Sequence, residues 1–174
     1  PPGDDPWSVM MRARADLGLV THLTLHELNG AAARLAWTVA GTTVSVCENP
    51  QVLQAAARAG SAGALVCTSG NPASAAWVLL RRLLGQGALV RYHGDFDWPG
   101  VVIAGRILAA GVQPWRMGAS DYEDAVAAAS SADKLPLAGT PGATPWDPQL
   151  AVSMSRIGVA VHEEALLNVL LADL

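Results

Sequence analysis

Four short apolar runs, each followed by a stretch with helical spacing, constrain the fold of this chain from residue 42 onward. Apolar strands that alternate with helices are typical of parallel sheets, which are buried on both faces and joined by helical crossovers. The sequence therefore predicts a Rossmann-like α/β fold with a mostly parallel four-stranded sheet flanked by helices. The expected strands are Thr43–Cys47, Ala64–Thr68, Ala88–Tyr92 and Val112–Met117, and the expected helices are Pro50–Ala59, Pro72–Leu84, Pro99–Ala110 and Asp121–Ser130.

Three of the four strand-to-helix turns carry a proline where the helix should begin, at Pro50, Pro72 and Pro99. Proline suits the first helical position because the N–H that it lacks would have no partner there. This phasing makes Trp98 the cap of the third helix. The acidic residues just before Trp98 are then poorly explained as caps.

The segments on either side of this core, which spans residues 41–135, are less regular. Residues 1–40 are expected to form a linker and an N-terminal extension, with a helix over 7–17 and a strand or extended segment over 20–28. The polar start of the chain has no apolar segment of the kind that a signal peptide needs. We interpret it as the tail of a linker in a longer protein.

Residues 136–174 are expected to close the domain. A Pro/Gly-rich loop spans 136–148, and an amphipathic helix from about Val161 to Ala172 is expected to pack back on the core. Within the core, the pair Ser120 and Glu123 has the spacing of a capping box at the start of the fourth helix.

Composition narrows the class of protein. With 174 residues, 51% of them apolar and 15% charged, the chain is long enough and apolar enough for one globular domain. The apolar runs are too short to span a membrane, and Cys47 and Cys67 lie in expected buried strands with no metal-binding spacing, which favours a reducing cytoplasm. A net charge of −4 argues against a grip on nucleic acid by this domain alone.

Three carboxylates follow two of the expected strands. Asp95 and Asp97 come after the third strand, and side chains two residues apart in extended chain point the same way. Glu48 follows the first strand, so it belongs at the same edge of a parallel sheet, where ligands bind. Carboxylate oxygens are the ligands that Mg²⁺ or Mn²⁺ prefers. The sequence therefore predicts a divalent-metal site made by Glu48, Asp95 and Asp97.

A structural interpretation of these residues stands beside the metal site. Aspartates before a turn commonly cap helices or close Asx turns. Glu48 is harder to explain in this way, because an acidic residue at the end of a run as apolar as Val44–Cys47 is costly unless it is paired or metal-bound.

The order of these motifs resembles the Toprim domain of topoisomerases, primases and related nucleases. Three strings are closer still to a bacterial family of uncharacterised proteins with a Toprim-like C-terminal domain, which resembles the nuclease subunit of the Wadjet plasmid-defence system and the A subunit of topoisomerase VI. The strings are Cys47-Glu48-Asn49-Pro50, Thr68-Ser69-Gly70-Asn71-Pro72 and Tyr92-His93-Gly94-Asp95-Phe96-Asp97-Trp98-Pro99-Gly100.

This resemblance implies that Glu48 is a metal ligand or general acid/base and that Asp95 and Asp97 hold Mg²⁺. It also implies that the substrate is DNA, which the full-length protein would bind. Protein partners in a defence complex are implied as well. Two departures matter. The string Ser69-Gly70-Asn71 has no carboxylate, and no winged-helix segment with a nucleophilic tyrosine is recognisable.

Other polar residues have a functional and a structural interpretation. Ser69 and Asn71 could bind an anion at a helix start, although Asn71 also fits a plain helix cap. His93 could contact a phosphate or simply end its strand. His162-Glu163-Glu164 begins like a zinc-protease helix, but Leu166 replaces the second histidine. Glu163 or Glu164 could approach the acidic edge or lie on a solvated helix face.

Three functions remain open at this point. The first is a metal-dependent DNA nuclease or topoisomerase-like domain, and the second is a non-catalytic Toprim-fold module that assembles with partners. A haloacid-dehalogenase-type phosphatase also uses Asp-x-Asp, but it places the motif on its first strand rather than on its third.

Overall fold

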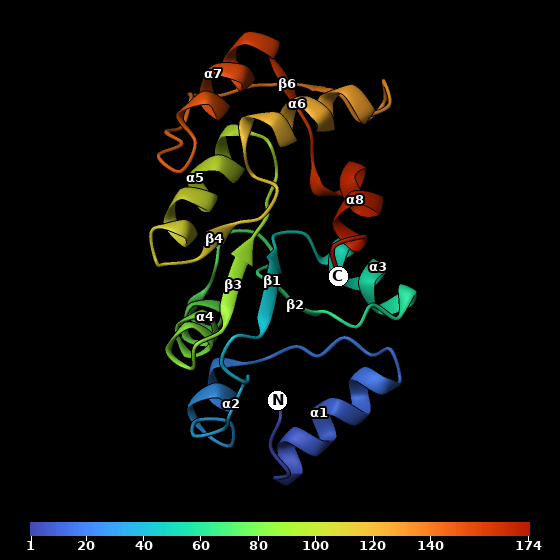
Figure 1. The fold of residues 1–174 in the computed structure, drawn as a ribbon, viewed down its shortest axis with the longest axis vertical. Coiled ribbons are helices and arrows are strands. Elements are labelled where there is room, and N and C mark those ends of the chain that lie inside the picture. Colours follow the sequence, from blue (N-terminus) through green and yellow to red (C-terminus); the bar gives the residue numbers. More distant parts are fainter.

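A computed structural model, which describes residues 1–174, confirms the α/β fold (Figure 1). Four parallel strands form one sheet in the order β2-β1-β3-β4. Their bounds are Thr43–Cys47 for β1, Ala64–Cys67 for β2, Leu89–Tyr92 for β3 and Gln113–Pro114 for β4. The fourth strand is shorter than expected: the Trp115 N–H still donates to the Tyr92 carbonyl oxygen, but Arg116, with φ of 48°, leaves the extended conformation.

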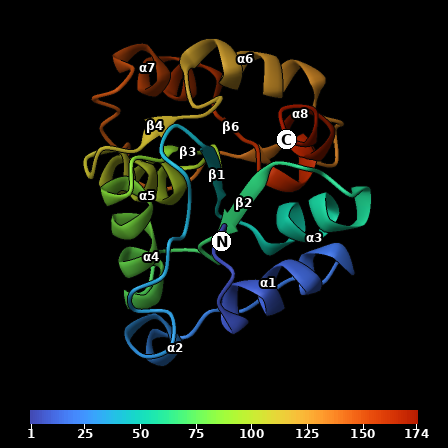
Figure 2. The ribbon, with the colours of Figure 1, turned by 60° about the horizontal axis from the view of Figure 1, so that its bottom comes forward.

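Helices cover both faces of this sheet (Figure 2). Helices α4 and α5 lie on one face, and α3 lies on the other, where α8 packs against it. The helices are α1 Pro6–Asp16, α2 Leu25–Asn29, α3 Pro50–Ala59, α4 Ser74–Gly85, α5 Trp98–Leu108, α6 Ala119–Ala128, α7 Pro148–Ile157 and α8 Leu167–Leu171, with a 3₁₀ turn, η1, at Glu163–Leu166. Two short strands, β5 Leu135–Pro136 and β6 Val159–Ala160, pair antiparallel.

The strand order creates a switch point between β1 and β3. The chain leaves β1 through α3 toward β2, then returns through α4 past β1 to β3, and continues through α5 outward to β4. The connections after β1 and β3 therefore depart in opposite directions from neighbouring strands. In open α/β sheets, a crevice at the carboxyl ends of such strands is where ligands bind.

Helix α5 is fixed by its apolar side. Val101, Ala104 and Ile107 are completely buried, at the three-residue spacing that places them on one side of the helix. Burial of side chains of this size stabilises the fold by roughly 1–3 kcal/mol each. This packing sets where α5 begins and so fixes the residues that precede it.

The expected extended segment over 20–28 is wrong in its second half, which forms α2. The Thr24 hydroxyl accepts a hydrogen bond from the Glu27 N–H, and the Glu27 carboxylate accepts one from the Thr24 N–H. This reciprocal pair satisfies two N–H groups at the helix start. This capping box favours a helix more strongly than the alternating apolar pattern over residues 20–28 favours a strand.

Two helix starts differ from the predicted ones. Helix α4 begins at Ser74 rather than Pro72, because Ser69 and Gly70 adopt left-handed backbone conformations that lengthen the turn. Helix α6 begins at Ala119, and the carboxylate of Asp121 accepts a hydrogen bond from the Gly118 N–H. The expected capping box at Ser120 and Glu123 is therefore wrong by two residues.

The predicted C-terminal helix is interrupted. Val161 pairs with Phe96 in an isolated antiparallel bridge, which extends the backbone just where the helix was expected to begin. The chain then makes η1 and α8. No helix was predicted between residues 149 and 160, but α7 occupies most of this range. Asp147 caps α7, and Pro148 occupies its first position.

None of the helices combines the length and the apolar composition that a membrane crossing requires.

An ion pair ties α8 to the end of β4. The Asp173 carboxylate accepts hydrogen bonds from Arg116 Nε and Nη2 at 2.6 and 2.7 Å and from the Trp115 indole N–H at 2.7 Å. The Arg116 guanidinium holds the pKa of Asp173 at about 2.

We predict that Asp173→Asn lowers the free energy of unfolding at pH 7 by about 1 kcal/mol, the scale of a partly exposed ion pair. Because the folded-state pKa is depressed, this contribution is complete above the unfolded pKa and declines as pH falls from about 5 toward 2. Denaturant titrations of both proteins at pH 7 and pH 3 measure it. A difference that grows toward pH 3 would contradict the prediction.

Candidate metal site

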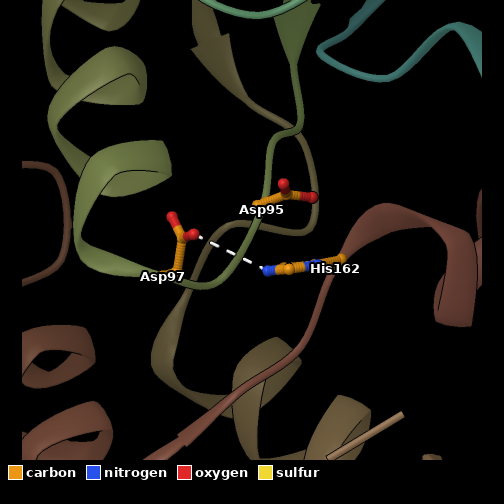
Figure 3. A group of neighbouring side chains, drawn as sticks. All are labelled: Asp95, Asp97 and His162. Atoms are coloured by element: carbon orange, nitrogen blue, oxygen red, sulfur yellow. Dashed lines mark ion pairs between the residues drawn. The ribbon is translucent and has the colours of Figure 1, made fainter. Parts of the chain in front are cut away.

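Three side chains converge at the carboxyl edge of the sheet (Figure 3). Asp95 and Asp97 lie in the loop between β3 and α5, and His162 lies between β6 and η1. One potential ligand atom from each lies within 4.8 Å of the other two. All three side chains are partly exposed. This group contains the predicted Asp-x-Asp pair and a histidine that the sequence pattern had not placed there.

Asp97 has two roles in this arrangement. It is the cap of α5: its Oδ1 accepts a hydrogen bond from the Gly100 N–H at 2.7 Å. The prediction that Trp98 caps this helix is wrong, because α5 begins one residue earlier and Pro99 occupies its second position. The other oxygen, Oδ2, lies 3.7 Å from His162 Nε2. One oxygen therefore serves the fold while the other faces the site.

Asp95 is held by main chain from the distant C-terminal segment. Its Oδ1 accepts a hydrogen bond from the Glu163 N–H at 2.8 Å. Burial raises the pKa of Asp95, the Glu163 N–H lowers it, and the neighbouring charge of Asp97 raises it further. The carboxylate is therefore placed where a cation would relieve its desolvation and repulsion.

Glu48 directly follows β1 and lies beside the three-residue group rather than within it. The Tyr92 hydroxyl donates a hydrogen bond to its Oε2 at 3.3 Å. Gly94 is required next to it, because a Cβ there would lie 2.6 Å from the Tyr92 hydroxyl and 3.1 Å from Glu48 Oε2. Burial raises the pKa of Glu48, and the charges of Asp95 and Asp97 raise it further.

A fourth carboxylate, Glu163, lies beneath this edge. It is fully buried, and its oxygens accept hydrogen bonds from the main-chain N–H groups of Glu48 and Asn49. Burial raises the pKa of Glu163 to about 9. In the sequence, Glu163 is part of the His162-Glu163-Glu164 string. We interpreted the two glutamates of this string most simply as a solvated helix face.

The other predicted binding residues lie apart from the group. Ser69 is exposed, with φ of 55°, and its N–H donates to Cys67 Sγ. Asn71 lies before α4 and lines a shallow hollow of about 440 Å³ together with Trp98 and Arg106. The cap position of α4 is Ala73, so Asn71 is not the cap of this helix.

His93 belongs to the core. Its ring is 1% exposed, and its Nδ1 lies 2.9 Å from the Trp115 carbonyl oxygen. Burial lowers the pKa of His93 to about 4, so the ring is neutral near pH 7. The structure thus favours the structural interpretation of His93 over contact with a phosphate.

The donor set fits a divalent cation. Two atoms bound to one Mg²⁺ at about 2.1 Å can be at most about 4.2 Å apart. The 3.7 Å between Asp97 Oδ2 and His162 Nε2 lies below this limit, but three ligands cannot all be opposite one another, so the rest of the group needs closure of up to roughly 2 Å. The two carboxylates suit Mg²⁺ or Mn²⁺, and the imidazole also suits a softer transition metal.

The fold and this edge define an α/β domain with a carboxylate–histidine cluster at the switch point of a parallel sheet. Residues 21–174 match the model of a family described as "Protein of unknown function C-terminus (DUF2399)". The chain belongs to this family, which agrees with the expectation of an uncharacterised C-terminal domain. No curated protein and no solved structure matched the chain.

Gly100 provides a test of how tightly the acidic loop is packed. A Cβ at this position would overlap the carbonyl oxygen of Asp95 and approach Asp97 Oδ1 to 3.0 Å. We predict that Gly100→Ala lowers the free energy of unfolding by about 1–3 kcal/mol, the usual range for overpacking. Thermal or denaturant unfolding measures the change.

Gly105→Ala on the same helix is the matched control. Its Cβ would meet only Trp146 at 3.5 Å, an ordinary contact, and alanine favours the helix. We expect this variant to be as stable as the native chain or more stable. Equal destabilisation by both substitutions would show that the helix, and not the acidic loop, is sensitive.

Proposed function

We propose that this domain is a Toprim-like, Mg²⁺- or Mn²⁺-dependent phosphodiester-cleaving domain that acts on DNA as part of a larger protein. The observation that carries the proposal is the convergence of Asp95, Asp97 and His162, with Glu48 beside them, at the switch point between β1 and β3. The resemblance of the three strings to Toprim-like nucleases supports the choice of reaction, and a role in bacterial defence follows from the same resemblance.

Each residue has a distinct role in this proposal. Asp95, Asp97 and His162 would hold the cation, which when bound orients a phosphodiester and activates water. Glu48 is the acid/base: burial raises its pKa from the ordinary value, the direction that a general acid/base requires, and the Tyr92 hydroxyl donates a hydrogen bond that orients its carboxylate. Its carboxylate could also complete the coordination.

Most of the binding affinity for DNA must come from parts of the protein outside the metal site. The net charge of −4 gives this domain little general attraction for phosphates. The hollow lined by Asn71, Trp98 and Arg106 begins at the start of α5, next to Asp97, and its one charged side chain, Arg106, comes from the last turn of the same helix. We assign it to the nucleotides that flank the cleaved bond.

The alternative is a non-catalytic module that keeps the fold for assembly with a protein partner. The acidic net charge favours this function, because it needs no grip on nucleic acid. Metal-dependent cleavage of DNA separates the two, since an assembly module cleaves nothing even if a cation binds at the switch point.

Asp97→Asn separates the two roles of Asp97. Asparagine caps helices as well as aspartate does, so we expect unfolding free energies within about 0.5 kcal/mol of native. Loss of the charged ligand should weaken Mn²⁺ binding at least tenfold, as measured by calorimetry. Asp97→Ala should lose the same affinity and about 1 kcal/mol of stability as well.

Asp124→Asn, an exposed change of the same charge on α6, is the control and should bind Mn²⁺ like the native chain. Native-like affinity in Asp97→Asn would mean that Asp97 is only a helix cap.

The reaction itself is tested by nicking of supercoiled plasmid with the full-length protein. We expect cleavage that needs Mg²⁺ or Mn²⁺, stops with a chelator and falls at least a hundredfold in Glu48→Gln, because that variant cannot exchange the proton. Equal nicking by the native protein and Glu48→Gln would refute the assigned role of Glu48. No nicking by native protein that binds the metal would favour the assembly module.

A further inference from the structure

The short segment 162–164 contacts both halves of the site, although it lies far from them in sequence. His162 faces Asp97, and the Glu163 N–H donates to Asp95, which precedes it by 68 residues. The carboxylates of Glu163 and Glu164 reach the turn after β1, about 115 residues away. Figure 1 shows this segment passing from α7 toward α8 beside the sheet.

The Glu163 carboxylate is committed to main chain. It is fully buried, and Oε2 lies 3.0 Å from the Glu48 nitrogen and also accepts from the Asn49 N–H. These two N–H groups belong to the turn that carries Glu48 out of β1. A buried carboxylate with its oxygens occupied in this way orients the turn and is not itself a ligand.

The main chain of the same residue orients the other strand. The Glu163 N–H donates to Asp95 Oδ1 at 2.8 Å, which fixes one carboxylate oxygen and leaves Oδ2 available to the site. Antiparallel pairing of Val161 with Phe96 keeps this N–H in register with the loop after β3. One residue therefore holds the carboxyl ends of β1 and β3 together.

We propose that Glu163 is a positioning residue of the metal site: its carboxylate fixes the main chain of Glu48, and its N–H orients the carboxylate of Asp95. The proposal rests on the proposed function, since it assigns a purpose to the alignment of these two carboxylates. It adds a residue outside the Glu48, Asp95 and Asp97 set and explains why a buried acid lies at this place.

Glu164 offers a matched comparison one residue along the chain. Its Oε1 accepts from Asn49 Nδ2 at 2.6 Å and from Gln51 Nε2 at 3.3 Å, both side-chain groups. Glu164→Gln therefore makes the same chemical change next to the site without touching the main chain of Glu48. We expect it to leave the alignment of Glu48 and Asp95 unchanged.

The first measurement uses the metal-free chain and nuclear magnetic resonance. In the native chain we expect couplings across the hydrogen bonds from the Glu48 and Asn49 amide nitrogens to the Glu163 carboxyl carbon, and from the Glu163 amide nitrogen to the Asp95 carboxyl carbon. Glu163→Leu removes the carboxylate acceptors at similar volume and should shift or broaden the carboxyl carbon signal of Glu48. Glu163→Gln retains one oxygen for both N–H groups and should preserve this signal.

Absence of the couplings in the native chain would overturn the proposal. An unchanged Glu48 carboxyl signal in Glu163→Leu would also overturn it. If the leucine variant does not fold, the couplings in the native chain and in Glu163→Gln decide the question alone.

The second measurement is Mn²⁺ binding by calorimetry. We expect at least a tenfold loss of affinity in Glu163→Leu, and affinity within about threefold of native in Glu163→Gln and Glu164→Gln. Loss in both Glu163 variants, or in neither, would overturn the positioning role while the proposed function stands. Failure of the native chain to bind Mn²⁺ would instead refute the proposed function. The resonance measurements on the metal-free chain would still test whether Glu163 positions Glu48 and Asp95.

Discussion

The parallel pairing of β1 with β3 is the constraint on which the site depends. Val44 lies opposite Val90 and Val46 opposite Tyr92, so the two strands end at nearly the same level of the sheet. A slip of one residue would turn the buried side chains of one strand toward the wrong face. The register is therefore fixed by the apolar core, and the core in turn fixes where the acidic residues emerge.

The acidic edge is electrostatically unfavourable by itself. Burial and mutual repulsion raise the pKa of Glu48, Asp95 and Glu163, and His162 is the one potentially cationic side chain of the metal-ligand group. Groups arranged in this way must share protons or bind a cation. A structural role alone could be filled by apolar or amide side chains, which supports the proposal of a metal site at this edge.

The sequence predicted those parts of the molecule that depend on local pattern. Apolar runs located β1, β2 and β3, and the rule that the carboxyl ends of parallel strands share an edge predicted that Glu48 lies near Asp95. Proline phasing located the start of α3, but it misplaced the start of α4 by two residues and that of α5 by one. The Asp97 carboxylate accepts a hydrogen bond from the Gly100 N–H and so begins α5 one residue earlier than Pro99 indicated.

The contributions of His162 and Glu163 could not be found by such rules. Periodicity describes a helix face, and in this segment it favoured a continuous helix with exposed acids. The bridge between Val161 and Phe96 breaks that helix and turns Glu163 inward. Contacts across 68 and 115 residues leave no trace in local spacing.

These long separations also order events during synthesis of the chain. Strands β1 to β4 and their helices are complete once residue 128 has been made, so the sheet can form first. The Glu48 turn and the Asp95 side chain gain their shared support only when residue 163 leaves the ribosome and docks. A partly made chain would therefore display the three carboxylates without the geometry that aligns them, and any chemistry at this edge would wait until the segment around residue 163 is in place.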